Sequence, residues 1–259
     1  MKGRILIIAG SDSGGGAGIQ GDIKTVSALG GYAMTAITAI TVQNTMAVSD
    51  VHAVPPHIIE AQMRVVLDDI GADAIKTGML HDKDVIEIIA KVLNEKKSIP
   101  AVIDPVMISK SGNALLQANA IDALKTKLLP LATLITPNIP EAEALLGKPI
   151  SDMKDAARAL GTFGSKAVLL KGGHAHGDVI TDILWDGNAI TEWQSPRLNS
   201  KHTHGTGCTL ASAIAVSLGQ GMPLKESITR ARDYVMGAIK HAPGYGHGHG
   251  PLNHSWNQS

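Results

Sequence analysis

Short apolar runs alternate along the chain with segments of helical periodicity. Residues 5–9 are a buried-strand pattern, and residues 33–42 form a second strand pattern rich in β-branched side chains. Four more short apolar runs predict strands at 72–76, 101–104, 133–136 and 167–170. Helices are predicted at about 19–29, 56–69, 83–94, 206–218 and 224–241, with Pro56 suited to a first helical turn.

This strand–helix alternation predicts an α/β fold with a doubly wound, mainly parallel central sheet and helices on both faces. Residues 179–185 and 189–193 flank Asp186-Gly187-Asn188 and predict a hairpin, which would be a small antiparallel edge addition. No Pro-rich linker and no internal repeat divides the chain, so we expect one domain over residues 1–259. The Gly- and His-rich tail, 243–259, is either a folded flap over the site or a loose end.

Composition narrows the functional classes. Apolar residues make up 44% of the chain but aromatic residues only 3%, which suits an aliphatic core around a parallel sheet. Basic and acidic residues both number 23, and without a basic face we expect no nucleic-acid partner. The single cysteine favours a reducing compartment and a cytoplasmic location, and we expect no membrane partner because no apolar stretch reaches spanning length.

Unusual residues follow most of the predicted strands. In doubly wound sheets, ligands bind at the carboxyl ends of the strands, where such residues meet. This clustering predicts a ligand site more strongly than any single motif. The residues concerned are Gly10 onward, Gln43, Thr77 to Met79, Asp104-Pro105, Thr136 to Asn138 and Lys171 to Gly173.

The loop after the first strand reads GSDSGGGAGIQG, with six glycines in residues 10–21. It contains a G-x-G-x-x-G, but a dinucleotide site also needs an acid after the second strand, where Gln43 and Asn44 stand. A phosphate-binding P-loop fails as well, because Asp22-Ile23 replaces the required Lys and Ser/Thr. Either the loop is simply a tight turn, or it approaches a flat ligand with Asp22 bonding an amine or hydroxyl.

A second glycine motif, Gly205-Thr206-Gly207-Cys208, precedes a helix of small residues. Exposed amides and the helix dipole at such a start favour an anion, as phosphoryl transfer requires. A thiol in the first helical turn commonly has a lowered pKa, so Cys208 could take a hydroxyl proton. The equally weighted alternative is that Cys208 is a small buried apolar residue.

Four polar residues are candidates for metal or phosphate contacts. Asp104 follows a strand and suits Mg²⁺, although a turn residue is the plain alternative. Asn138 and Glu141 could serve phosphate and a metal-bound water, or simply begin a helix. Lys171 could reach a nucleotide phosphate or be a solvated lysine. The tail histidines match no zinc spacing, and the glycines between them indicate flexibility, so we interpret them as loop residues.

Taken together, these segments resemble the ribokinase-like superfamily and, within it, hydroxymethylpyrimidine/phosphomethylpyrimidine kinases. The similarity runs in the family's order over nearly the whole chain, and GSDSGGGAGIQ and THGTGC are its most specific motifs. The resemblance implies a ribokinase-like fold, ATP and Mg²⁺ as cofactors, a pyrimidine substrate and a homodimer. The other matching segments are TVQNT, KTGML, DPVM, TPN-x-x-EA, LLKGGH and GHGPLNH.

The resemblance also implies residue roles. The substrate hydroxyl would attack the γ-phosphorus of ATP in line, and a second cycle would convert monophosphate to pyrophosphate for thiamine biosynthesis. Cys208 would assist proton removal, with Gly205, Thr206 and Gly207 forming the anion hole. Asp104, Asn138 and Lys171 would lie on the nucleotide side, with Glu141 and Asp104 serving Mg²⁺. The pyrimidine would be surrounded by Ala17, Asp22, Gln43, Met79 and Val106.

Alternative functions remain open at this point. Gly21 and Val42 depart from the family's usual Ala residues beside the pocket, which bears on substrate preference. A pyridoxal/pyridoxine kinase of the same superfamily would also phosphorylate a hydroxymethyl group on a flat ring. A non-catalytic vitamin-binding protein would be expected to lose the glycine motif or the carboxylates, which are present here. An NAD-dependent oxidoreductase is a distant third alternative.

Overall fold

The computed structural model describes residues 2–108, 115–174 and 177–258. Within these residues nine strands form one sheet in the order β3-β2-β1-β4-β5-β6-β7-β8-β9. In this order, neighbouring strands from β2 through β1, β4, β5 and β6 to β7 pair in parallel. β3, β8 and β9 pair antiparallel at the two edges. The strands are β1 (Arg4–Asp12), β2 (Tyr32–Gln43), β3 (Val48–Ala53), β4 (Ala74–Thr77), β5 (Ala101–Ile103), β6 (Leu134–Ile135), β7 (Val168–Leu170), β8 (Val179–Trp185) and β9 (Ile190–Pro196).

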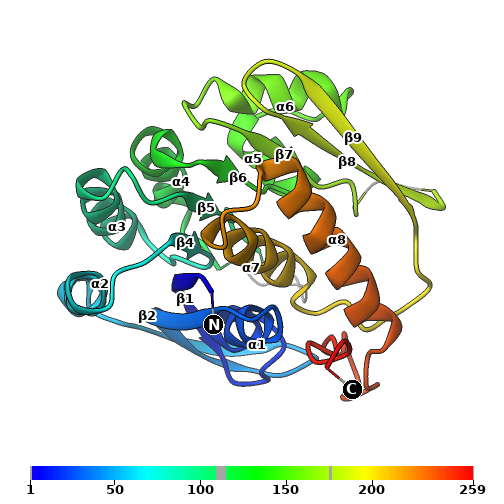
Figure 1. The fold of residues 1–259 in the computed structure, drawn as a ribbon, viewed down its shortest axis with the longest axis horizontal. Helices are drawn as coiled ribbons and strands as arrows, with labels where there is room; N and C mark the ends of the chain where they lie inside the picture. The colour runs from blue at the N-terminus through cyan, green and yellow to red at the C-terminus, as the bar shows by residue number, and fades with distance from the viewer. Residues whose placement is uncertain (1, 109–114, 175–176, 259) are drawn as a thin grey trace.

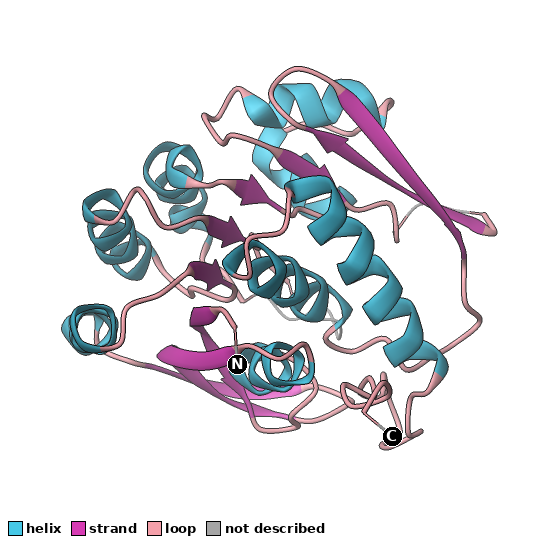
Figure 2. Ribbon diagram, in the orientation of Figure 1, coloured by secondary structure: helices cyan, strands magenta, loops and turns pink. Residues whose placement is uncertain are grey.

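Helices cover both faces of the sheet (Figures 1 and 2). One layer contains α1 (Gly18–Ala28), α7 (Thr206–Gly219) and α8 (Leu224–Lys240). The other contains α2 (Pro56–Asp69), α3 (Lys83–Glu95), α5 (Ile139–Leu146) and α6 (Met153–Gly161). It also holds a run of short helical turns, Ala118–Ala120, α4 (Ile121–Ala123), Leu124–Leu128 and Leu129–Leu131.

The central strand β1 divides the core between these layers. Successive strand side chains point to opposite faces, so Ile5 and Ile7 pack against the α1–α7–α8 layer. Leu6 and Ile8 pack against the α2–α3 layer instead. All four are fully buried, which explains why the sequence shows a continuous apolar run rather than alternation.

The structure confirms the predicted fold class and the order of the predicted elements. The predicted hairpin is present as β8 and β9. The sequence analysis missed β3, which adds a second antiparallel edge, and also missed α6 and the helical turns of 118–131. β3 is short and mostly exposed, so its sequence VSDVHA carries little apolar signal.

The carboxyl ends of the parallel strands meet at one edge of the sheet, as predicted. β1 runs on through Asp12, so the glycine loop starts directly from a paired strand. α7 begins over this edge, and its residues pack against β1, β4 and β5. Among the described residues, no helix is both long enough and apolar enough to cross a membrane.

Candidate active site

The two glycine motifs lie in direct contact at the carboxyl edge of the sheet. Gly205 precedes α7 with φ +84°, in the left-handed region that favours glycine. A Cβ atom at Gly205 would lie 1.8 Å from the carbonyl oxygen of Gly16. The close approach therefore requires glycine and joins the glycine loop to the start of α7.

The first turn of α7 faces a charged pair. A Cβ atom at Gly207 would lie 3.3 Å from Lys171 Nζ and 3.7 Å from Asp104 Oδ2. The amides of a first helical turn have no partner within the helix, and the helix dipole is positive there. The turn containing Gly205, Thr206 and Gly207, here called the anion loop, therefore has the geometry to receive a phosphate beside Lys171.

Lys171 is shared between two carboxylates. Its Nζ donates to Asp104 Oδ1 at 2.9 Å and lies 3.9 Å from Glu141 Oε2. Thr136 Oγ1 also donates to Asp104 Oδ1, at 2.9 Å. Burial disfavours the ammonium, but the two carboxylates outweigh it and hold the pKa of Lys171 above its ordinary value. Lys171 is thus a paired lysine at the site and not a solvated one.

Asn138 and Glu141 form a reciprocal cap at the start of α5. The Glu141 amide donates to Asn138 Oδ1 at 2.9 Å, and the Asn138 amide donates to Glu141 Oε2 at 2.8 Å. Burial raises the pKa of Glu141 to about 7, against the opposing effect of Lys171. The helix-start interpretation of N-x-x-E is therefore confirmed. The cap also leaves Glu141 close enough to Lys171 for a role at the site.

Asp22 lies beneath the site and not on its surface. Its two oxygen atoms accept from Lys76 Nζ at 2.8 and 2.7 Å, and Ser212 Oγ donates to Oδ1 at 2.7 Å. Asp22, Lys76 and Ser212 have no exposed surface. Asp22 was expected to bond an amine or hydroxyl of the ligand; here its oxygen atoms are instead engaged inside the protein. Sequence analysis did not identify Lys76 as its partner.

Cys208 lies on the first turn of α7 and is partly exposed. The sequence left two interpretations equally weighted, a thiol with a lowered pKa and a small buried apolar residue, and the direction of the pKa contradicts the first. Burial among protein atoms raises the pKa of Cys208 to about 11, although the nearby Lys76 ammonium opposes the change. The thiol is therefore protonated at neutral pH.

The remaining predicted residues line the apolar side of the same edge. A Cβ atom at Gly10 would lie 3.0 Å from Met79 Sδ, so Met79 borders the glycine loop. Val106 packs against the small cluster that contains Met79. Ala17 and Gln43 are both partly exposed at the ends of the glycine loop and of β2. The structure thus brings an apolar wall and one carboxamide to the same edge as the anion loop.

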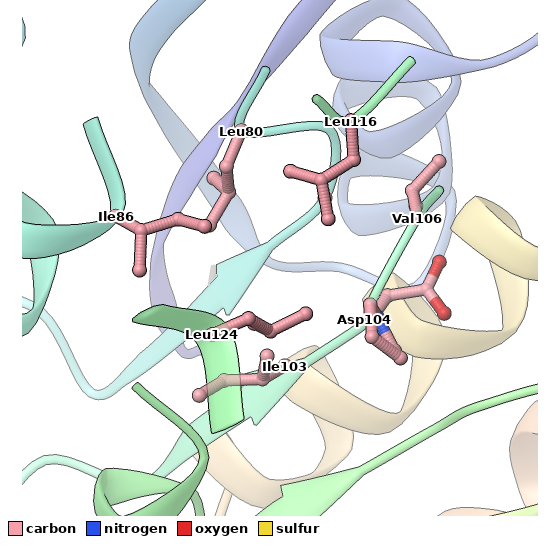
Figure 3. A pocket seen from close by; sticks show the side chains of 9 residues that line it. Leu80, Ile86, Ile103, Asp104, Val106, Leu116 and Leu124 are labelled. Atoms are coloured by element: carbon pink, nitrogen blue, oxygen red, sulfur yellow. The ribbon is translucent and has the colours of Figure 1, made fainter. Parts of the chain in front are cut away.

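A small void lies behind this wall (Figure 3). Its volume is about 10 Å³, and Leu80, Leu116 and Leu124 are among its lining residues. That is roughly the space of one water molecule, so the void is packing space and not the ligand site. Asp104 borders it, but its carboxylate points away from the aliphatic side chains.

Sequence analysis missed a second polar pair, Asp12 and His204. His204 Nε2 lies 2.8 Å from Asp12 Oδ2, and both residues are buried. Asp12 also accepts from the backbone N–H groups of Gly14, Gly16 and Ala17, at 2.8, 3.1 and 2.8 Å. The sequence did indicate both positions, since an aspartate precedes three glycines in one loop and a histidine directly precedes the anion loop.

The tail is folded against the site. The His204 amide donates to the Gly250 carbonyl at 3.1 Å, and the Gly248 amide donates to Thr45 Oγ1 at 3.3 Å. His254 Nε2 lies 3.1 Å from Thr209 Oγ1. The tail glycines do not mark flexibility, since a Cβ atom at Gly248 would lie 2.0 Å from the Thr45 carbonyl oxygen. Across the described ranges, no group of three or more His, Cys, Asp or Glu is arranged to hold a metal ion.

Comparisons with known proteins agree with this geometry. The chain is 52% identical over 256 residues to the thiamine biosynthesis bifunctional protein ThiED of Geobacter sulfurreducens, covering 98% of this chain but only 52% of that protein. It thus spans about half the length of this relative. It is 48% identical to the hydroxymethylpyrimidine/phosphomethylpyrimidine kinase of Haemophilus influenzae, with 97% of this chain and 96% of the relative covered.

Among solved structures, the ADP complex of Bacillus subtilis pyridoxal kinase superposes with a TM-score of 0.91. The sequences are 37% identical, and the match covers 100% of this chain and 99% of that one. The model of the phosphomethylpyrimidine kinase family matches residues 12–253. This span includes both glycine motifs, the Lys171 cluster and the start of the folded tail, and the chain therefore belongs to the phosphomethylpyrimidine kinase family.

Proposed function

We propose that this chain transfers the γ-phosphoryl group of ATP to the hydroxymethyl group of 4-amino-5-hydroxymethyl-2-methylpyrimidine. A second transfer, to the monophosphate, gives the pyrophosphate used in thiamine biosynthesis. One observation carries the proposal: the anion loop, with Gly207 against Lys171 and Asp104, faces the same sheet edge as Gln43 and Met79. A phosphate site thus adjoins a site for a flat polar ring.

The residue roles follow from charge and position. The anion loop amides would stabilise negative charge on the transferring phosphoryl group, as preorganised donors do in phosphoryl transfer. Lys171 would exchange its carboxylate partners for phosphate oxygens, because it is already held beside Gly207. Asn138 would contact phosphate from the start of α5. Ala17, Met79 and Val106 would pack on the ring, while Gln43 would bond its amine and nitrogen edge.

The carboxylates fit a magnesium ion that arrives with the nucleotide. Asp104 Oδ2 faces the anion loop, and Glu141 Oε2 lies 3.9 Å from Lys171 Nζ. Magnesium prefers carboxylate oxygens and retains several waters, so these two residues would hold it directly or through water. When bound, the ion would neutralise charge on the phosphate oxygens. The related pyridoxal kinase structure is an ADP complex, which supports an adenine nucleotide as a ligand of this fold.

We assign supporting roles to Cys208 and Asp22. A protonated thiol cannot act as a base, so Cys208 would hydrogen-bond the attacking hydroxyl instead of abstracting its proton. Phosphoryl transfer through a loose transition state needs little help from a base. Asp22 would act through Lys76 and Ser212 by holding the floor of the site beneath α7.

A second candidate activity is phosphorylation of pyridoxine or pyridoxal. The close structural match to a pyridoxal kinase favours it, although the sequence is more similar to the pyrimidine kinases. The deciding test is an ADP-release assay with Mg-ATP and three separate substrates: the hydroxymethylpyrimidine, its monophosphate and pyridoxine. We expect turnover on both pyrimidines to exceed that on pyridoxine. Turnover on pyridoxine alone would overturn the substrate assignment.

We further propose a homodimeric, cytoplasmic enzyme with one domain over residues 1–259. The single nine-stranded sheet supports one domain, and the lone cysteine supports a reducing compartment. Ile40 and Val42 on β2 are 51% and 58% exposed, an apolar surface that suits a second copy of the chain. Light scattering on the purified protein should give twice the monomer mass, and Ile40→Lys should shift it to the monomer.

A further inference from the structure

Three polar side chains meet where the glycine loop, the end of β2 and the anion loop converge. His204 Nε2 lies 2.8 Å from Asp12 Oδ2 and 3.4 Å from the amide nitrogen of Gln43. Asp12 and His204 are only 2% and 7% exposed, whereas Gln43 is partly open to the site. The buried pair therefore contacts, from behind, the carboxamide that faces a ligand.

The positions of the protons follow from the partners of Asp12. Its oxygen atoms accept backbone N–H groups from Gly14, Gly16 and Ala17. Although burial opposes it, these bonds and His204 hold the pKa of Asp12 below its ordinary value, so Asp12 is an ionised acceptor. His204 Nε2 must then carry a hydrogen and donate it to Asp12. A Gln43 NH₂ group at 3.4 Å would place a second donor against this first one.

The contacts of Thr41, at the other end of the carboxamide, favour the same orientation of Gln43. Its Oγ1 lies 2.8 Å from the Ser11 carbonyl oxygen, which can only accept, so the Thr41 hydrogen points there. The Gln43 atom 3.2 Å from Thr41 Oγ1 is the carbonyl oxygen Oε1, so two acceptors meet there once the Thr41 hydrogen bonds Ser11. An NH₂ group satisfies this contact, and a carbonyl oxygen does not. Both neighbours therefore favour the Gln43 oxygen toward His204 and the nitrogen toward Thr41.

This orientation leaves one acceptor and one donor of Gln43 for a ligand. The oxygen faces the His204 N–H, whose single hydrogen is donated to Asp12 at 2.8 Å, and so keeps its lone pairs for a ligand. The nitrogen keeps one hydrogen beyond its bond to Thr41. An aminopyrimidine presents the complementary pair, an amino N–H beside a ring nitrogen. Pyridoxine has ring hydroxyl groups and no amine beside its ring nitrogen. A carboxamide free to turn would suit both rings, whereas a fixed one favours the aminopyrimidine.

We infer that Asp12 and His204 are positioning residues that fix the orientation of the Gln43 carboxamide, and thereby select an aminopyrimidine over a pyridine ring. The inference rests on the proposed function and adds to it a determinant of specificity. Neither residue needs to touch the substrate. Their effect on catalysis is indirect, so the signature is a change in preference between substrates.

The test compares kcat and KM for hydroxymethylpyrimidine and pyridoxine in the wild type, His204→Leu and His204→Gln. In His204→Leu, kcat/KM for the pyrimidine should fall by about tenfold or more, mainly through KM, because one aligned hydrogen bond is lost. The value for pyridoxine should change by less than about threefold. His204→Gln keeps an N–H donor and should restore the wild-type preference.

A second variant distinguishes the proposed change in preference from a folding defect in His204→Leu. Thr41→Val removes the hydroxyl from the other side of Gln43 at nearly constant volume, and should shift the preference in the same direction by a smaller factor. Equal losses on both substrates in His204→Leu and Thr41→Val would show a purely structural role and overturn the inference. Failure of the wild type to turn over the pyrimidine would instead overturn the proposed function, and the inference with it.

Discussion

Two lysine–aspartate pairs lie near the first turn of α7, and they differ in exposure and in their partners. Lys76 and Asp22 are 2.7 Å apart and both side chains are 0% exposed, with the two Asp22 oxygen atoms bonded to the same ammonium. Lys171 and Asp104 are 2.9 Å apart, but Lys171 is 13% exposed and Glu141 lies within 3.9 Å of it. The Lys76–Asp22 pair is shielded from solvent, whereas Lys171 is partly exposed beside the anion loop.

This difference indicates two separate roles: the Lys76–Asp22 pair stabilises the structure beneath the site, and Lys171 is placed to contact a ligand. A fully buried pair has lost its water and cannot change partners without leaving a bare charge in the core. Lys171 lies near a second carboxylate, that of Glu141, and beside Gly207, so it can exchange one anion for another. Similar residues at neighbouring strand ends thus have different tasks, and four changes can break or sharpen this contrast.

The largest effect is expected from Lys76→Met. It removes the ammonium partner of the fully buried Asp22, which should lower the free energy of unfolding by about 3–5 kcal/mol in urea denaturation. Adding Asp22→Asn should recover most of this loss, since no buried charge then remains. Lys91→Met is the matched control, because Lys91 is 60% exposed and pairs at the surface with Glu60. If the Lys76→Met protein were as stable as this control, the buried pair would have no special role in stability.

Lys171→Met should act mainly on catalysis. Loss of a cation beside the transferring phosphoryl group should lower kcat by about 100- to 1000-fold. The loss of unfolding free energy should be smaller than for Lys76→Met, because Lys171 is 13% exposed and Thr136 still donates to Asp104. Lys166→Met, at an exposed position ahead of β7, should leave both values near those of the wild type. A fall in stability with unchanged kcat would reverse the assignments of the two lysines.

Glu141→Gln should alter the pH dependence of stability. The pKa of Glu141 is raised from 4.5 to about 7, so its contribution is fully present below pH 4.5 and is lost as pH rises through about 7. In urea titrations without nucleotide, the stability of the wild type relative to Glu141→Gln should fall by about 2 kcal/mol between pH 5 and 8. A wild type that gains on the variant as pH rises would contradict the raised pKa.

Cys208 lies near both pairs, because its charge state influences both lysines. Because the thiol pKa is raised to about 11, Cys208→Ala should lower kcat by less than about tenfold. Iodoacetamide should react slowly with the wild-type thiol at pH 7.5 and faster as pH rises past 9. Rapid alkylation at pH 7.5, or a loss of more than about a thousandfold in Cys208→Ala, would restore the thiolate-base hypothesis.

The sequence was sufficient to predict the elements that carry strong periodicity. The predicted bounds of the helix at 56–69 agree with α2, because Pro56 and a clear apolar stripe define it. β3 could not be predicted because it pairs only at an edge and buries little. Local patterns describe helix starts and buried runs well, but they say little about a strand whose stability comes from its neighbour.

The sequence predicted which residues lie near the site, but not the side chains with which they pair. Positions at strand ends predicted Asp104 and Lys171 as neighbours, and the family resemblance added the anion loop. Nothing local indicated that Lys76 pairs with Asp22, 54 residues away. The raised pKa of Cys208 was missed for a similar reason. The helix start was visible in the sequence, whereas the burial that outweighs it depends on segments far away in the chain.

The folded tail has a consequence for the order of folding. The backbone of His204, next to the anion loop, bonds Gly250, and Thr209 of α7 contacts His254. Thr209 and His254 are 45 residues apart, so their contact closes a long loop and costs chain entropy. The sheet and α7 can therefore form first, and the surroundings of the anion loop are completed only when the tail docks against them.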